Sequence, residues 1–253
     1  MLSLLKMTHS NPINQGGRER FFVIDGVDGT GKATQTRLLV SRLASEDIPV
    51  QTISFPQYDK PSSGALQEYL RGTYGQTNEV SPEAASILFA VDRFDGSFRI
   101  KQWLAEGSVV IADRFVSSNM GHQGSKFTDR AKRQRYLAWE DELEFGIMKL
   151  PRPTQTIVLT MPAEISFGLA RQGASEKTKV QGDIHEQDMA HLKASEETYR
   201  EIAGMFPHFH LIDCAPNGTL RTREEIHEEI WRYIKPHVSL TTSVQSEKQK
   251  LTV

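Results

Sequence analysis

The chain has 253 residues, which is enough for one large domain or two small ones with a sizeable buried core. Its 30 Lys and Arg residues nearly balance its 32 Asp and Glu residues, which argues against binding to nucleic acid or an anionic membrane through overall charge. The only cysteine, Cys214, excludes an intramolecular disulfide and a multi-cysteine metal site. We expect it to be a small buried residue at a strand end, in a protein of a reducing compartment.

The two ends of the chain differ in composition from its middle. No apolar run approaches the ~20 residues that a membrane span needs, so we expect no membrane association and a cytoplasmic location. Residues 1–18 predict a flexible leader and residues 238–253 a polar C-terminal tail. Residues 19–237 then form a single domain.

Five short apolar runs predict the strands of that domain. They are too short for helices and have little polar alternation, which is typical of parallel strands buried on both faces. The runs cover residues 21–24, 50–54, 109–112, 156–159 and 209–212. Helical patterns separate them, so the sequence predicts a three-layer, doubly wound α/β fold around a five-stranded parallel sheet. Ligands of such sheets bind beyond the carboxyl ends of the strands.

Three apolar stripes at helical spacing are interpreted as core faces. The first helix begins with a Ser81 cap and Pro82 at its first position. The stripes are Ile87, Val91, Phe94 and Phe98; Tyr136, Trp139, Leu143 and Ile147; and Ile226, Ile230 and Ile234. Acidic residues surround the second stripe, namely Glu140, Asp141, Glu142 and Glu144.

A glycine-rich motif follows the first strand and precedes a helix. It matches G-x-x-x-x-G-K, except that Ala33 stands where Ser or Thr usually follows the lysine. Glycines let backbone N–H groups surround phosphate oxygens, and the helix N-terminus and Lys32 add positive charge. The motif predicts a nucleotide phosphate site made of Gly26, Val27, Asp28, Gly29, Thr30, Gly31, Lys32, Ala33 and Thr34. Ala33 cannot ligate Mg²⁺, which leaves Thr34, or waters and carboxylates, to hold the ion.

Charged residues at the end of the third strand indicate a binding site for a phosphoryl acceptor. Asp113 and Arg114 end that strand beside the predicted phosphate site, where the carboxylate suits Mg²⁺-bound water and the guanidinium suits a phosphate. A structural ion pair is the alternative. The chain has no N-K-x-D motif, which counts against a GTPase.

Two further segments complete this interpretation. Phe89, Asp92 and Arg93 share a helix face other than the first apolar stripe, which suits stacking on a flat heterocycle, although a surface aromatic beside a salt bridge is equally compatible. The polar segment around residues 171–184 predicts a lid with the cations Arg171, Lys177 and Lys179, or else a solvated loop.

Taken together, these motifs resemble the thymidylate kinase family of P-loop nucleoside monophosphate kinases. The resemblance extends from about residue 20 to 233. It is carried by DGVDGTGKATQ at 25–35, FPQY at 55–58, LFAVDRF at 88–94, DRFVSSNMGHQG at 113–124 and DIHE at 183–186. It implies a P-loop kinase fold with a short lid, a homodimer, no nucleic-acid partner, and the phosphorylation of dTMP to dTDP by ATP with Mg²⁺.

The resemblance also implies roles for single residues. Lys32 would cradle the ATP phosphates, Arg171 would lie over adenine, and Lys177 and Lys179 would stabilise the transition state. The acceptor would contact Asp28, Phe55, Phe89, Arg93, Arg114, Asn119, His122 and Glu186. Phe89 would stack on thymine, Arg93 and Asn119 would bond its edge, and Arg114 would grip its phosphate. Asp28, Asp113 and Glu186 would lie near the metal.

Gly29 stands where some members carry a catalytic arginine, so this chain resembles the class whose lid supplies the charge. Four positions depart from the family pattern. Gln57 replaces a frequent arginine, His122 replaces the Tyr or Phe credited with excluding a ribose 2′-hydroxyl, His185 replaces a common arginine, and Ala33 lacks the hydroxyl noted above. Two alternatives stay open: a kinase for another nucleotide such as dUMP, and a non-catalytic nucleotide-binding homologue.

Overall fold

A computed structural model describes residues 20–76, 78–174 and 189–238. All five predicted runs form strands, and all are parallel, in the order β2-β3-β1-β4-β5. The strands are β1 (Phe21–Gly26), β2 (Val50–Ser54), β3 (Val109–Asp113), β4 (Gln155–Thr160) and β5 (Phe209–Asp213). The predicted leader, most of the predicted lid and nearly all of the predicted tail lie outside the described residues.

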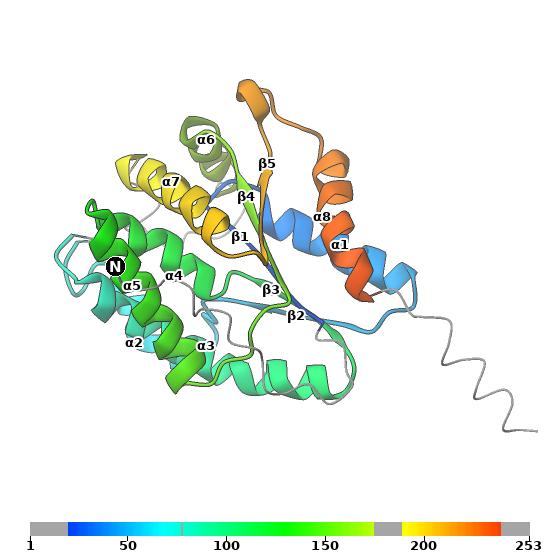
Figure 1. The fold of residues 1–253 in the computed structure, drawn as a ribbon, viewed down its shortest axis with the longest axis horizontal. Helices are drawn as coiled ribbons and strands as arrows, with labels where there is room; N and C mark the ends of the chain where they lie inside the picture. Colours follow the sequence, from blue (N-terminus) through cyan, green and yellow to red (C-terminus); the bar gives the residue numbers. More distant parts are fainter. Residues whose placement is uncertain (1–19, 77, 175–188, 239–253) are drawn as a thin grey trace, which may run out of the picture.

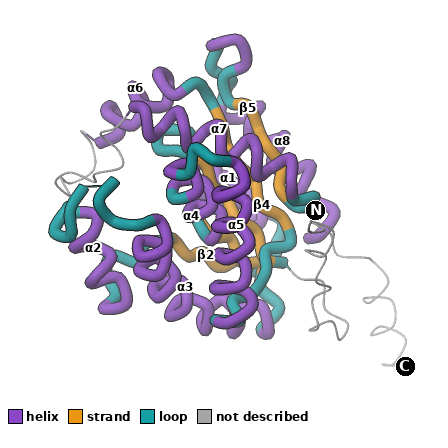
Figure 2. Tube along the Cα trace, turned by 60° about the vertical axis from the view of Figure 1, so that its left-hand side comes forward, coloured by secondary structure: helices purple, strands orange, loops and turns teal. Residues whose placement is uncertain are grey.

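Helices cover both faces of the sheet, which confirms the three-layer prediction (Figures 1 and 2). Helices α1 and α8 pack on one face, and α3, α4 and α7 on the other. The α-helices are α1 (Lys32–Ser45), α2 (Gly64–Leu70), α3 (Pro82–Ala105), α4 (Val116–His122), α5 (Arg130–Asp141), α6 (Ala163–Ala174), α7 (Met189–Met205) and α8 (Arg223–Val238). Shorter turns are η2 (Pro61–Ser63), η3 (Gly124–Lys126), η4 (Glu142–Ile147) and η5 (Pro216–Gly218).

Strand β1 shows why the strands lack polar alternation. Phe22 and Ile24 belong to the apolar cluster under α1 and α8, whereas Phe21 and Val23 belong to the cluster under α3 and α4. Because both faces are covered, every side chain of the strand is buried. This packing holds the carboxyl end of β1 at a fixed place, where the glycine-rich loop begins.

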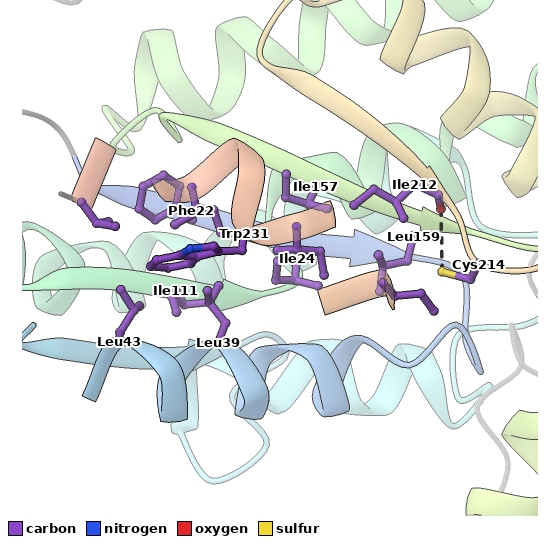
Figure 3. Close-up of a cluster of buried hydrophobic side chains, with 14 of the residues drawn as sticks. Phe22, Ile24, Leu39, Leu43, Ile111, Ile157, Leu159, Ile212, Cys214 and Trp231 are labelled. Atoms are coloured by element: carbon purple, nitrogen blue, oxygen red, sulfur yellow. Dashed lines mark hydrogen bonds between the residues drawn. The ribbon is translucent and has the colours of Figure 1, made fainter. Parts of the chain in front are cut away.

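The cluster under α1 and α8 confirms two predictions (Figure 3). Ile226, Ile230 and Ile234 are buried in it, as expected of the third stripe. Cys214 is fully buried just after β5, and its thiol donates to the carbonyl of Ile212 at 3.7 Å. Burial raises the pKa of this thiol to about 12, so it behaves as a small apolar residue.

Helix α3 begins as predicted but presents the opposite face to the core. The Ser81 hydroxyl accepts from the Ala84 N–H at 3.1 Å, and Pro82 opens the helix. The prediction that the first apolar stripe is buried is wrong. Its four side chains are 41–59% exposed: Ile87, Val91, Phe94 and Phe98. Small and polar residues of α3 are buried instead, and Asp92 and Arg93 among them bind groups on other elements, as described below.

The second predicted stripe is also only partly correct. Tyr136 is buried, but Ile147 is 68% exposed. Turn η4, which contains Ile147, is π-helical. Tyr136, Glu140 and Glu144 follow one another at intervals of four residues and share one helix face. Both acids, interpreted from the sequence as part of a surrounding acidic rim, are fully buried.

Candidate active site

The glycine-rich loop joins β1 to α1 at the carboxyl edge of the sheet. Gly29 and Gly31 have φ of 83° and 91°, which L side chains rarely adopt. Packing adds a second requirement: a Cβ on Gly26 would lie 2.2 Å from the carbonyl oxygen of Leu159, and one on Gly29 would lie 1.9 Å from that of Ser166. Glycine is therefore needed here for backbone approach to β4 and α6. The Gly29 contact leaves no room for an arginine at this position.

Lys32 is the first residue of α1 and lies folded over this loop. Its Nζ donates to the Val27 carbonyl at 2.8 Å and lies 3.4 Å from Asp28 Oδ1. Burial lowers the pKa of Lys32, and the nearby Arg114 guanidinium lowers it further, against the opposing effect of the carboxylates. A phosphate anion at the loop would relieve this crowding of positive charge.

Asp28 and Arg114 meet although 86 positions separate them in the chain. Parallel pairing places Ile24 of β1 opposite Asp113 of β3, so both strands deliver their next residues to one edge. Arg114 Nη2 forms an ion pair with Asp28 Oδ1, and its Nη1 donates to the Gly26 carbonyl at 3.4 Å. The Arg114 backbone has φ of 69°, a strained conformation for a non-glycine residue.

The pKa values of the two carboxylates at this edge, Asp28 and Asp113, are shifted in opposite directions. Burial alone would raise the pKa of Asp28, but Arg114 and Lys32 outweigh it and hold that pKa below its usual value. Burial raises the pKa of Asp113, because Lys32 and Arg114 compensate it only partly. The edge therefore combines two cations with two partly accessible carboxylates.

Asp25 is a buried residue of this region that the sequence interpretation did not single out. Its Oδ1 accepts from Gly26 N–H at 2.8 Å, Ser118 Oγ at 2.7 Å and Tyr199 Oη at 2.9 Å, and its Oδ2 accepts from Ser117 Oγ. These bonds tie the end of β1 to α4 and α7. The available signal was an acidic residue closing an otherwise apolar strand directly before the loop.

The expectation that the face of α3 with Asp92 and Arg93 lies outside the core is wrong, because both side chains are only 1% exposed. Asp92 accepts from the Gln57 backbone N–H at 2.8 Å and from Ser62 Oγ at 2.7 Å. Gln57 Nε2 donates to the Asp92 carbonyl at 2.9 Å. Gln57 thus fixes the segment after β2 to α3, a role that its residue type did not reveal.

Arg93 is bound to a buried acid of η4. Its Nε and Nη2 donate to the two carboxylate oxygens of Glu144 at 2.7 and 2.5 Å. Its Nη1 donates to the Phe115 carbonyl at a longer 3.4 Å. Phe89, one turn earlier on α3, is half-buried and packs edge-on against Tyr69, with ring centroids 6.3 Å apart.

Three other predicted acceptor residues lie on neighbouring elements. Phe55 is buried after β2, with its ring centroid 5.8 Å from that of Phe115. Asn119 is buried in α4. His122 ends α4 and stacks on His191, with ring centroids 5.6 Å apart. The backbone of Arg171 lies in α6, and Lys177, Lys179 and Glu186 lie outside the described residues.

Comparison with known proteins identifies the family. A family model described as thymidylate kinase matches residues 24–230, which include the loop, both strand ends and α3. The chain belongs to the thymidylate kinase family. The thymidylate kinase of Mycobacterium tuberculosis strain H37Rv is 31% identical over 182 residues, covering 71% of this chain and 84% of that protein. That of Rhodopseudomonas palustris strain TIE-1 is 29% identical over 230 residues, covering 90% and 94%.

The fold of this thymidylate kinase family member is also found in a solved structure. The structure of thymidylate kinase from Candida albicans superposes with a TM-score of 0.64 at 22% identity, covering 87% of this chain and 92% of that one. Within the described ranges, no helix combines the length and apolar character that a membrane crossing requires.

Proposed function

We propose that this chain transfers the γ-phosphoryl group of ATP to dTMP, giving ADP and dTDP. The observation that carries the proposal is the convergence of Asp28, Lys32 and Arg114 at one edge of the sheet, in a chain of the thymidylate kinase family. A glycine-rich loop and two cations beside it suit two phosphorylated substrates that must meet.

ATP would lie with its phosphates on the loop of residues 26–34. The backbone N–H groups of the loop and the start of α1 would surround the phosphate oxygens, and Lys32 would move from the Val27 carbonyl onto the β- and γ-phosphates. Arg171 would lie over the adenine. Because Gly29 has no space for a side chain, positive charge at the transferring group would come from Lys177 and Lys179.

The acceptor phosphate would bind Arg114. That guanidinium is held beside the loop by its ion pair with Asp28, so a bound phosphate would exchange one anionic partner for another. The acceptor oxygen is already anionic, so the reaction needs no strong base. Asp28, released from the pair, would then accept a hydrogen bond from the sugar 3′-hydroxyl.

The base would lie between α3 and α4. Phe89 would stack on thymine, Phe55 would contribute apolar surface, and His122 would face the sugar. Asn119 and the Nη1 group of Arg93 would bond the edge of the base. The weak 3.4 Å bond of that Nη1 supports this assignment, since Glu144 occupies the rest of the guanidinium.

The carboxylates at the sheet edge fit Mg²⁺, which favours oxygen ligands and commonly takes one or two carboxylates, with phosphate oxygens and waters completing the shell. In the described part of the chain no three His, Cys, Asp or Glu side chains converge as a closed metal site. Asp28 and Asp113, with Glu186 from the segment after the lid, would hold the ion together with the nucleotide. When bound, Mg²⁺ neutralises phosphate charge.

The exposed stripe of α3 supports a homodimer as the working assembly. Four large apolar side chains face solvent along one side of the helix, and the rings of Phe94 and Phe98 contact each other with centroids 5.2 Å apart. A patch of this kind marks a protein interface. A second copy of the chain would offer the same stripe, as two-fold symmetry requires.

We place the enzyme in the cytoplasm.

A coupled ADP-release assay tests the proposal. The unmodified chain is given Mg-ATP with dTMP, dUMP, dCMP, dGMP, UMP, AMP or no acceptor. We expect strong preference for dTMP and little ADP without acceptor, because an open site would hydrolyse ATP. Equal use of dUMP or UMP would widen the acceptor class. ATP binding without acceptor-dependent ADP release would refute the transfer reaction.

A further inference from the structure

A buried polar cluster lies where α3, α4 and the α5–η4 segment meet. It contains Arg93, Asn119, Glu140 and Glu144, which are each at most 2% exposed. Arg93 Nη2 lies 2.5 Å from Glu144 Oε1 but 3.8 Å from Glu140 Oε1. The cation is therefore matched by Glu144, and Glu140 is a second acid in the cluster with no cation of its own among the described residues.

The surroundings of Glu140 favour its neutral form. Burial, and next the Glu144 carboxylate, raise the pKa of Glu140 well above its usual value. Its Oε2 is buried and has no hydrogen-bond partner in the described chain. A proton on Glu140 supplies a donor for the Glu144 carboxylate, while Oε1 stays an acceptor.

That acceptor fixes the side-chain amide of Asn119. Nδ2 of Asn119 donates to Glu140 Oε1 at 2.7 Å and to the backbone carbonyl of Ser86 at 3.2 Å. The carbonyl only accepts, so the amide nitrogen rather than the oxygen must face this side. Both amide hydrogens are then used.

The oxygen of the same amide is left for a ligand. No described residue donates to Asn119 Oδ1, and this atom is not one of the fully buried polar atoms that lack a partner. The backbone carbonyl of Asn119 accepts from the Tyr136 hydroxyl at 3.2 Å and from the Gln123 N–H at 2.8 Å. These two bonds keep the backbone of Asn119 in place.

We propose that Glu140 is a positioning residue for base selection: it holds the Asn119 amide with its oxygen toward the acceptor base. This inference rests on the proposed function. An amide oxygen pairs with the N3–H of thymine or uracil. It opposes the bare N3 of cytosine, which is itself an acceptor, so two acceptors would face each other without a hydrogen.

Replacing Glu140 tests the role of its acceptor oxygen. Glu140→Leu removes the oxygen, so the amide turns more freely and presents its nitrogen to cytosine. We expect the dTMP-to-dCMP ratio of kcat/KM to fall about three- to tenfold, the range of one neutral hydrogen bond. Glu140→Gln mimics the protonated acid, with an oxygen for Asn119 and an amide N–H₂ for Glu144, and should keep the ratio within about twofold of the parent.

Two internal controls separate base selection from general damage. The ratio of dTMP to dUMP should not move in any variant, because both bases carry N3–H. Glu142→Gln, on the exposed side of the same segment, should behave as the parent. An unchanged dTMP-to-dCMP ratio in Glu140→Leu, or an equal loss for all acceptors, would overturn the inference and leave Glu140 a packing residue.

A second measurement needs no variant. In a crystal structure of the unmodified chain with dTMP, Asn119 Oδ1 should lie about 3 Å from N3 of the base while Nδ2 stays on Glu140. N3 bonded to any other group would refute the proposal. A parent enzyme that does not turn over dTMP would overturn the proposed function and this inference with it, whereas a parent active on dTMP with unchanged ratios in the variants would overturn the inference alone.

Discussion

The phosphate loop and helix α3 use charge in opposite ways. At the loop, Asp28 forms ion pairs with Lys32 and Arg114 at the carboxyl edge of the sheet and keeps a quarter of its side chain exposed. On α3, Arg93 and Asp92 are buried and satisfied by protein partners, and the helix turns apolar side chains to solvent. Asp28 and Arg114 therefore stay partly accessible, whereas Asp92 and Arg93 are paired inside the protein.

Breaking the buried ion pair of Arg93 on α3 should have the largest effect on the stability of the fold. Glu144→Ala leaves Arg93 charged and without its bidentate partner in the interior, which should destabilise the fold by about 3–5 kcal/mol. Urea unfolding of the variant measures this loss. Glu142→Ala, at an exposed position of the same turn, is the matched control and should change stability by less than about 0.5 kcal/mol. Equal stability of the two variants would show that the pair is not structural.

At the loop, the same kind of deletion should affect catalysis rather than folding. Arg114→Ala should reduce turnover of dTMP at least ~100-fold, the scale of losing a donor to transition-state charge. Loss of its ion pair with Asp28 and of its 3.4 Å bond to the Gly26 carbonyl should leave the unfolding midpoint close to that of the parent. Arg37→Ala, on the exposed side of α1, controls for a general loss of positive charge. Turnover within twofold of the parent would place the acceptor phosphate elsewhere.

The apolar side of α3 should govern assembly. Phe98→Asp puts a charge in the proposed interface, so the dimer Kd should rise at least about tenfold, the cost of one buried unpaired charge being well above 1.4 kcal/mol. Analytical ultracentrifugation over a concentration series measures it. Leu220→Asp replaces a side chain that is 50% exposed outside α3 and should leave the Kd unchanged. A parent that stays monomeric would contradict the dimer.

Removing the N-cap of α3 should have the smallest effect, a small loss of stability. Ser81→Ala removes one cap bond to the Ala84 N–H and should cost about 1 kcal/mol, measured by urea unfolding. Ser41→Ala, at an exposed position within α1, is the control and should be neutral or slightly stabilising because alanine is the better helix former. A loss as large as that of Glu144→Ala would mean that the loop before α3 depends on Ser81 in some further way.

Local patterns predicted the parts of the site that depend on neighbouring residues in the chain. The strand runs, the loop of residues 26–34 and the start of α3 are each set by a few adjacent residues, and the structure has them where predicted. Their apolar character predicts parallel strands buried on both faces, and the observed pairing of β1 with β3 places Asp113 and Arg114 at the loop. The proposed roles of these residues toward ATP and dTMP stay predictions.

The sequence by itself determined the doubly wound fold and the phosphate loop, because strand burial and glycine conformations are encoded within single segments. Only the tertiary structure decided which side of α3 faces inward. The usual rule, apolar side in, failed because Glu144 and Gln57, distant in the chain, satisfy Arg93 and Asp92 inside the protein. Glu140 and Glu144 are buried for the same reason: a buried polar group is stable when it has partners, and Arg93 of α3 and Asn119 of α4 come from other elements.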